Sequence, residues 1–193
     1  MRHGETALNA ARVVQPADTP LSAHGRRQAT LAATRLAEMK PTALLSSDMP
    51  RAMQTAQAVS AATGLDIELL PLLQERNFGE LRGRPHADLG FDLGLLEAAP
   101  PGGESAAEFE QRAATAWAAV VARRAASPGT LIVVTHGLML RALLGLLLPE
   151  GQHIASSPPN TSITVLDAAP PHRLLLAPCT RHLDEGAPAG GIA

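Results

Sequence analysis

The sequence predicts an α/β fold, a three-layer α/β/α sandwich with a mostly parallel central sheet and a short irregular cap. Apolar segments short enough for buried strands alternate along the chain with longer segments of helical period. This alternation is typical of βαβ units that build a parallel sheet. Two of the apolar segments end in short polar sequences, "SSD" and "THG", and sites in such sheets form beyond the carboxyl ends of the strands.

The first half of the chain carries the signals of two helices. Ser22 is an N-cap residue before the pattern "AHGRRQATLAATRLAEM", and Gly64 is a C-terminal stop for the next pattern. Pro50 suits the first turn of that second helix, and Ser47 or Asp48 is expected to cap it. A short buried strand is expected at 42–47 and a second strand at 66–71.

The second half begins with an irregular stretch, residues 72–103, which is rich in Gly and Pro. Because a loop this long inside a compact domain is usually functional, we assign a cap region to about 76–103. Glu104 and Ser105 are expected to start the longest helix. The patterns predict, in order, a helix at 104–126, a strand at 130–137, a helix at 138–148 and strands at 160–168 and 172–178.

Length and composition limit the class of protein. The 193 residues fit one domain, assigned to 1–183, with 184–193 as a flexible tail. The net charge of −2 provides no basic field for nucleic acid. No apolar run has the length of a membrane span, and the start lacks the order of a signal peptide. With Cys179 as the single cysteine, we expect a cytoplasmic protein that binds neither nucleic acid nor membranes.

A group of polar residues follows the predicted strands and suits phosphoryl chemistry. Guanidinium groups bind phosphoryl oxygens in pairs, a neutral imidazole can attack phosphorus, and a carboxylic acid can protonate the leaving oxygen. None of these roles needs a metal, and the sequence contains neither GxxxxGK[ST] nor HExxH. We therefore expect no metal and no cofactor. The residues in question are Arg2, His3, Asn9, Arg51, Glu75 and His136.

Five ordered motifs carry a resemblance to a known family. They are "RHGETALNAARVVQPADTPLSAHGRRQA", "SSDMPRAMQTAQ", "LLQERNFGELRG", "PGGES" and "VVTHGLMLRALL". In this order they resemble the histidine phosphatase superfamily, also called phosphoglycerate-mutase-like, over roughly residues 2–167. The tripeptide RHG alone would be a weak signal, and the specificity comes from five motifs at compatible spacings.

The resemblance implies a catalytic role for three residues. His3 matches the nucleophile that becomes phosphohistidine, and Glu75 matches the proton donor. His136 matches the second histidine of the phosphate pocket, where a protonated imidazole would stabilise charge in the transition state.

The resemblance also implies a set of substrate-binding residues. Arg2 and Arg51 match the phosphate pocket, and Asn9 matches an asparagine that hydrogen-bonds the phosphoryl group. Gln15 matches the pocket mouth more loosely. Arg76 is our candidate contact for a substrate anion, and the equal alternative is that Arg76 is a surface charge. Gly4 and Gly137 are expected to let the backbone pass close to its neighbours.

The superfamily contains phosphatases and mutases. A mutase would be expected to have a long basic insertion after Glu75, whereas residues 76–103 are few and contain only Arg76, Arg82 and Arg84 as basic residues. A short cap admits water, so we predict a metal-independent phosphomonoesterase that acts on a small phosphorylated metabolite. The alternatives are a phosphoglycerate mutase and a non-catalytic phospho-ligand-binding module. A monomer or a homodimer is expected.

The start of the sequence raises a separate expectation. Family members place an apolar strand of roughly five or six residues before RHG, and here only Met1 stands there. Without that strand, ladder groups would be unpaired and His3 would lie on a frayed terminus. We therefore expect a strand before Arg2 that the sequence does not contain. A protein without this strand should be less stable, poorly active, or completed by a segment from another molecule.

Overall fold

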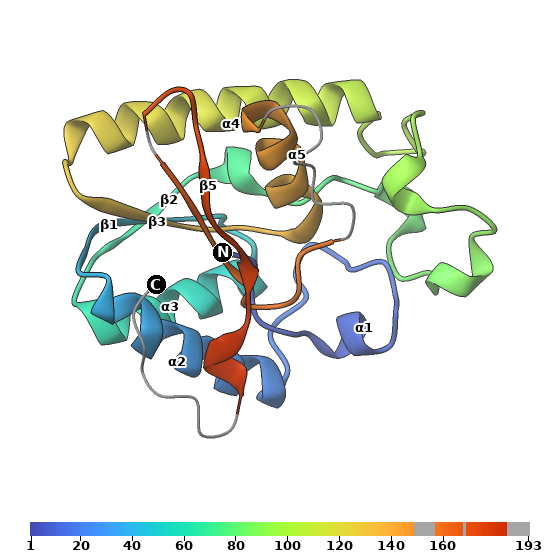
Figure 1. Ribbon diagram of the computed structural model, residues 1–193. Coiled ribbons are helices and arrows are strands. Elements are labelled where there is room, and N and C mark those ends of the chain that lie inside the picture. Colours follow the sequence, from blue (N-terminus) through green and yellow to red (C-terminus); the bar gives the residue numbers. More distant parts are fainter. Residues whose placement is uncertain (149–156, 168, 185–193) are drawn as a thin grey trace.

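A parallel sheet of three strands, in the order β2–β1–β3, forms the centre of the molecule (Figure 1). The computed structural model describes residues 1–148, 157–167 and 169–184. The strands are β1 (Pro41–Ser46), β2 (Ile67–Leu69), β3 (Thr130–Val134), β4 (Ile163–Leu166) and β5 (Leu174–Cys179). The α-helices are α1 (Ala7–Ala10), α2 (Ala23–Glu38), α3 (Pro50–Thr63), α4 (Ala106–Ala126) and α5 (Gly137–Leu147).

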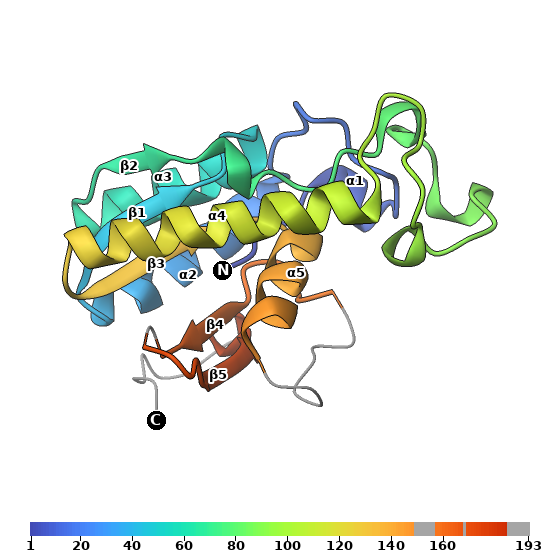
Figure 2. The same cartoon turned by 90° about the horizontal axis from the view of Figure 1, so that it is seen from above.

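Helices cover both faces of this sheet, which confirms the predicted three-layer α/β/α sandwich (Figures 1 and 2). On one face, α2 and α3 pack small residues such as Ala32 and Ala56 against Leu44 and Val134. On the other face, α4 and α5 bury Phe109, Ala113 and Met139 against Leu45. Alanine-rich helix faces allow a close approach to the sheet, so the abundant alanine is used in packing.

The helix signals in the sequence are borne out with one exception. Ser22 accepts a hydrogen bond from Gly25 N and caps α2, and Gly64 ends α3 in the left-handed conformation. Ser105 caps α4 and forms a capping box with Glu108. The cap of α3 was predicted wrongly: Met49 is its N-cap, without a side-chain hydrogen bond. Ser47 is instead buried in the site described below.

Most of the strands are shorter than predicted, whereas β1 has the predicted length and begins one residue earlier. β1 begins at Pro41 and β3 ends at Val134, so Thr135 and His136 lie beyond the strand. β4 and β5 form a separate antiparallel hairpin around the turn that contains Pro170 and Pro171. Both strands were predicted, at 160–168 and 172–178, and the structure shows that they pair with each other.

Residues 76–103 extend from one end of the sandwich as the irregular cap (Figure 2). They contain short 3₁₀ helices at Gly79–Leu81, His86–Asp88 and Leu93–Leu95, and Leu89 and Leu93 pack on Val14 and Phe78. The predicted tail falls largely outside the described residues. None of the helices in the described ranges combines the length and apolar character that a membrane span needs.

The N-terminal residues lie between β3 and β4. The expectation that His3 lies on a frayed terminus is wrong. Arg2 forms a parallel bridge with Thr135, and His3 is 1% exposed. His3 N donates to Thr135 O at 2.9 Å, and His3 O accepts from Thr161 N at 3.1 Å. Two neighbouring segments therefore hold the tripeptide without a complete strand before it.

Candidate active site

His3 lies at the carboxyl end of the sheet, and its backbone is fixed from several sides. Gly4 N donates to Thr55 Oγ1 at 3.0 Å, and the Asn160 side chain donates to His3 O at 3.0 Å. A Cβ on Gly4 would lie 2.4 Å from Gly25 O, and one on Gly25 would lie 1.9 Å from Glu5 O. Only two glycines allow α2 to approach the loop this closely.

The ring of His3 is arranged as a neutral nucleophile. Its Nδ1 lies 2.6 Å from Gly4 O; because a carbonyl only accepts, the proton is on Nδ1 and the lone pair is on Nε2. No described residue forms a hydrogen bond with Nε2. Burial, with the charges of Arg51 and Arg2, lowers the pKa of His3 well below its ordinary value. The imidazole is therefore neutral at neutral pH.

His136 lies directly after β3 and faces His3, with ring centroids 5.1 Å apart. Its Nε2 is 2.8 Å from Ser47 Oγ, at the end of β1. Burial and the neighbouring cations, Arg51 foremost, lower the pKa of His136 well below its ordinary value. This lowered pKa disfavours the protonated imidazole that would stabilise charge in the transition state. A bound phosphoryl dianion would oppose this effect and favour the protonated ring.

Two arginines complete the basic pocket. Arg51, in the first turn of α3, is 2% exposed and donates from Nη1 to Pro16 O and Ala17 O at 3.3 Å each. Arg2 donates from Nη1 to Pro158 O at 2.6 Å. Burial lowers the pKa of Arg51 to about 10, so its guanidinium remains charged at neutral pH.

Three buried nitrogen atoms in this pocket have no hydrogen-bond partner among the described residues. They are Nε of Arg2, Nε of Arg51 and Nδ1 of His136. A buried donor without a partner costs about 1–3 kcal/mol, and more when it is charged. An anion with several oxygens would supply the missing acceptors. The three atoms therefore suit an oxyanion such as a phosphoryl group.

Glu75 approaches the same pocket from the segment after β2. Its carboxylate accepts from Leu138 N at 3.0 Å and from Met139 N at 3.1 Å, so it caps α5 from outside that helix. Its charge acts on both Arg2 and Arg51. The carboxylate thus lies beside the basic residues that it was predicted to join. To donate a proton to a leaving group, it must turn one oxygen away from α5.

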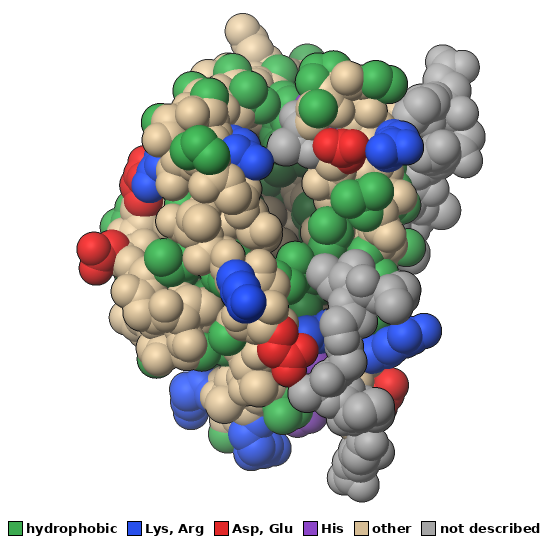
Figure 3. All heavy atoms as spheres, turned by 60° about the vertical axis from the view of Figure 1, so that its left-hand side comes forward, with side chains coloured by type: hydrophobic (Ala, Val, Ile, Leu, Met, Phe, Trp, Pro, Cys, Tyr) green, Lys and Arg blue, Asp and Glu red, His purple; other side chains and the backbone are tan. Residues whose placement is uncertain are grey.

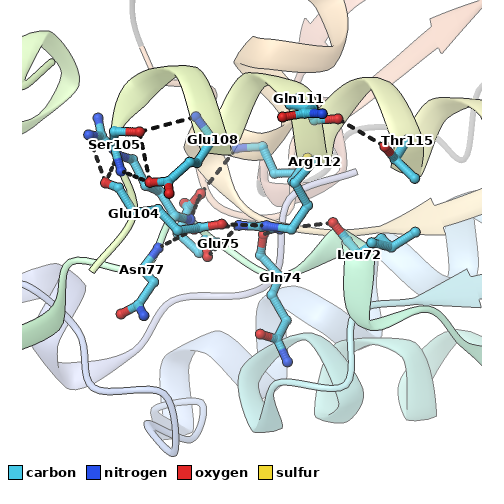
Figure 4. Close-up of polar contacts among 12 residues, drawn as sticks. Leu72, Gln74, Glu75, Asn77, Glu104, Ser105, Glu108, Gln111, Arg112 and Thr115 are labelled. Carbon is cyan, nitrogen blue, oxygen red and sulfur yellow. Dashed lines mark hydrogen bonds and ion pairs between the residues drawn. The ribbon is translucent and has the colours of Figure 1, made fainter. Parts of the chain in front are cut away.

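The segment that carries Glu75 is fixed by Arg112 of α4 (Figure 4). Arg112 Nη1 donates to Leu72 O and Gln74 O at 2.9 and 2.8 Å, and Nη2 donates to Glu75 O at 3.2 Å. Nε and Nη2 also bind both carboxylate oxygens of Glu104, at 2.7 and 2.8 Å. One guanidinium therefore ties the loop before the cap to the start of α4.

The remaining predicted residues lie around this centre with different contacts. Asn9 Oδ1 accepts from Thr6 N and from the Asn160 side chain, at 3.3 and 3.2 Å. Gln15 accepts from Thr6 Oγ1 at 2.7 Å. These contacts place Asn9 beside the backbone of His3, next to the pocket.

Arg76 and Gly137 have contacts that were not expected. Arg76 is 5% exposed, donates to Glu104 O at 3.0 and 3.2 Å, and lies over the Phe78 ring. Its guanidinium thus links the cap to α4 and is not a surface charge. A Cβ on Gly137 would lie 2.5 Å from Ser157 Oγ, so Gly137 leaves room for the Ser157 side chain.

Sequence reasoning missed the residues that hold the site from behind. Each acts through a hydrogen bond to a backbone or ring atom, so no pattern of charge or period identifies it. The sequence signal for Ser47 was its place after β1, which we read as a helix cap. The ring of His182 lies 3.2 Å from Thr161 Oγ1, and burial lowers the pKa of His182 to about 4. The missed residues are Ser47, Thr55, Arg112, Asn160, Thr161 and His182.

The described part of the chain contains no group of three His, Cys, Asp or Glu residues that could hold a metal ion. The pocket residues are mostly cations and neutral imidazoles, and these suit an anionic ligand. The expectation of a metal-free reaction remains a prediction, which treatment with a chelator can test.

Known proteins are similar to this chain in sequence and in structure. Residues 1–177 match the family described as the histidine phosphatase superfamily (branch 1). The chain is 37% identical over 167 residues to "Probable phosphoglycerate mutase GpmB" of Yersinia enterocolitica, with 79% of this chain and 75% of that protein covered. The structure is similar to a mycobacterial glucosyl-3-phosphoglycerate phosphatase in complex with VO3, with a TM-score of 0.78, 31% identity, and 91% and 95% of the two chains covered.

A third similarity is to the structure of a phosphoglycerate mutase from Bacillus anthracis, with a TM-score of 0.80, 25% identity, and 94% and 92% of the two chains covered. The relatives thus include proteins named as mutases and as phosphatases. The paired histidines, the two arginines and Glu75 lie together at one end of the sheet. With the family match over most of its length, this chain belongs to the histidine phosphatase superfamily, branch 1.

Proposed function

We propose that this protein is a metal-independent phosphomonoesterase that acts on a small phosphorylated metabolite through phosphohistidine at His3. The observation that carries the proposal is the state of His3. Its Nδ1 proton is held by Gly4 O, its Nε2 has no hydrogen-bond partner among the described residues, and its pKa is lowered by burial and by two arginines. A buried neutral imidazole beside unpartnered cationic nitrogens is suited to attack a phosphoryl group.

The reaction has two steps. In the first, His3 Nε2 forms a bond to phosphorus while the bond from phosphorus to the ester oxygen breaks, and Glu75 gives its proton to the leaving alkoxide. Arg2, Arg51 and His136 hold the phosphoryl oxygens during this transfer. In the second step Glu75 takes a proton from water, whose oxygen bonds to phosphorus as the N–P bond breaks. Inorganic phosphate leaves, and His3 is neutral again.

The cap supports hydrolysis over return of the phosphoryl group. Residues 76–103 are few, and Arg76, the first basic residue among them, is bound to Glu104 O and Phe78. A cap with little free basic charge closes poorly over a doubly charged intermediate, so water can reach it. The charge of Arg82 acts on Arg51 and lowers its pKa, so Arg82 is our candidate for contact with a second anionic group of the substrate.

The name of the Yersinia relative favours phosphoglycerate mutase as the second candidate function. A non-catalytic phospho-ligand-binding module is the third, and it is disfavoured because the nucleophile, the acid and the pocket cations lie together. The mycobacterial phosphatase makes glucosyl-3-phosphoglycerate a reasonable member of a substrate panel. That panel should also contain 3-phosphoglycerate, sugar phosphates and an aryl phosphate.

Rapid quench with substrate labelled on phosphorus tests the proposal. We expect an adduct that is stable to base and labile to acid, followed by labelled inorganic phosphate, without added 2,3-bisphosphoglycerate. His3→Ala should form no adduct, whereas His86→Ala, a matched change in the exposed part of the cap, should behave as the parent. Turnover that needs 2,3-bisphosphoglycerate and yields an isomer would support the mutase. Binding without turnover of any phosphate ester would support the third candidate.

A further inference from the structure

Ser47 follows β1 directly and is 0% exposed beside the second histidine of the pocket. Its Oγ is 2.8 Å from His136 Nε2 and accepts a hydrogen bond from Met49 N at 3.3 Å. The described residues give this hydroxyl no third hydrogen-bond partner. The proposed reaction assigns no role to Ser47, although its only side-chain partner in the described ranges is a ring that faces the phosphoryl group.

The two contacts of Ser47 Oγ determine where its proton points. A hydroxyl has one proton to donate, and the Met49 amide can only donate to it. His136 Nε2 is the acceptor that the described residues offer to this proton. If Nε2 carried a proton instead, the hydroxyl would accept twice and its own proton would be buried without a partner. Nε2 of His136 therefore carries the lone pair, and the ring proton is on Nδ1.

The other ring nitrogen of His136 is free to carry that proton. His136 is the N-cap residue of α5, a position from which side chains usually accept from amides of the first turn. Here the Glu75 carboxylate accepts from Leu138 N and Met139 N, and the His136 ring makes no capping hydrogen bond. Nδ1 thus needs no lone pair for the helix. It is buried without a partner among the described residues, as is Nε of Arg51.

His3 and His136 then carry their proton on the same ring nitrogen but present opposite groups to a ligand. Gly4 O holds the Nδ1 proton of His3, so the lone pair on Nε2 is free to attack. Ser47 occupies Nε2 of His136, so the N–H on Nδ1 is free to donate. Two rings in one tautomer can therefore serve as a nucleophile and as a hydrogen-bond donor.

We propose that Ser47 is a positioning residue that fixes His136 as the neutral tautomer with its proton on Nδ1, and that this N–H donates to a phosphoryl oxygen. The role as donor rests on the proposed function, whereas the tautomer is a property of the protein alone. The lowered pKa of His136 agrees with a neutral ring, since burial and the charge of Arg51 disfavour a second proton. A second proton, on Nε2, would also deprive the Ser47 hydroxyl of its acceptor.

Nitrogen-15 NMR of the histidine rings tests the tautomer directly. At neutral pH, without ligand and with inorganic phosphate, we expect a protonated Nδ1 and an unprotonated Nε2 for His136, whose signals are assigned by their loss in His136→Asn. Ser47→Ala should lose the fixed tautomer, and Ser47→Thr, which keeps a hydroxyl, should retain it. Ser46→Ala is the matched control, because Ser46 is equally buried and its hydroxyl donates to Ser47 O instead of a ring.

Phosphate binding and turnover give a second readout. Ser47→Ala should weaken the binding of inorganic phosphate and lower kcat/KM by roughly 10–100-fold, as for a weakened hydrogen bond to a charged group. The loss in kcat/KM should be equal for alkyl and aryl phosphates, because the donor contacts phosphoryl oxygens and not the leaving group. Ser47→Thr should restore most of both quantities, and Ser46→Ala should change neither.

Two results would overturn the proposal. The first is a His136 ring in the parent protein with an unprotonated Nδ1, or with both nitrogens protonated in the phosphate complex at neutral pH. This result does not depend on the folding of any Ser47 variant. The second is a folded Ser47→Ala protein with the parent's tautomer and phosphate affinity. Failure of the proposed function is distinct: the parent would show the expected tautomer and bind phosphate but hydrolyse no ester, which would support the role of Ser47.

Discussion

The phosphate pocket and the apolar cleft between β3 and β4 meet at the residues Met1–His3, and they are built from different groups. The pocket is basic, and the buried Nε atoms of Arg2 and Arg51 have no hydrogen-bond partner among the described residues. The cleft has apolar walls, to which Leu36 and Leu144 contribute, and Figure 3 shows a hollow with hydrophobic side chains in its walls on this side of the molecule. Substitutions in the pocket should therefore change turnover, and changes in the cleft should change stability.

The largest expected effect is on proton transfer in the pocket. Glu75→Gln removes the acidic proton but keeps an amide oxygen toward Leu138 N and Met139 N. With an alkyl phosphate, kcat should fall by roughly 10²–10⁴-fold, whereas an aryl phosphate, with its better leaving group, should lose far less. The pair of substrates is compared by steady-state kinetics. Equal losses on both substrates would remove Glu75 from the acid role.

Arg51→Ala should separate function from stability. We expect kcat/KM to fall by about 10²–10³-fold, because a charged donor to the phosphoryl group is lost. The Tm should hold or rise, because the guanidinium is 2% exposed and its Nε has no partner in the described residues. Arg82→Ala provides the contrast: it should raise KM with little change in kcat, because Arg82 is our candidate for contact with a second anionic group of the substrate. A large fall in Tm for Arg51→Ala would show that this arginine is structural.

Arg112 should act through the position of Glu75. Arg112→Lys retains a positive charge but loses the fork that binds Glu104 and the carbonyls of Leu72, Gln74 and Glu75. We expect kcat to fall by roughly tenfold with alkyl phosphates and less with aryl phosphates, the same substrate dependence as for Glu75→Gln. A uniform loss on both substrates would indicate a structural role only.

The two buried histidines should give the protein a dependence of stability on pH. Burial and the neighbouring cations lower the pKa values of His3 and His136 well below their ordinary value of 6.5. The unfolded chain therefore binds more protons than the folded chain below about pH 6.5, and stability rises with pH in that acid range.

Thermal melts from about pH 5 to about pH 8 check this dependence. The Tm should increase up to about pH 6.5 and level off above it, because the unfolded histidines are neutral there. A flat profile below about pH 6.5 would show that His3 and His136 are not buried in solution.

The smallest expected effect is that of a chelator. Excess EDTA should leave turnover and Tm unchanged, because every step of the proposed reaction uses side chains of this chain. The parent protein is assayed before and after dialysis against EDTA, with re-addition of Mg²⁺ and Zn²⁺. A reproducible loss that a metal restores would contradict the metal-free mechanism.

The sequence by itself determined the layers of the fold and most members of the pocket. Strand and helix periods are local properties, so the α/β/α sandwich and helix signals such as Ser22, Ser105 and Gly64 were readable. His3 and His136 were identified by motifs in which glycine follows histidine, and the structure brings their rings to 5.1 Å from each other.

Tertiary structure alone decided how these groups are held and charged. The carbonyl of Gly4 fixes the Nδ1 proton of His3, and Ser47 binds His136 from a strand that is remote in sequence. Arg112 donates a hydrogen bond to Glu75 O although the two residues are 37 positions apart in the sequence. The cleft beside β3 is also a tertiary feature, because it depends on which strands become neighbours. Hydrogen bonds and burial between distant segments leave no local period, so only the folded chain reveals them.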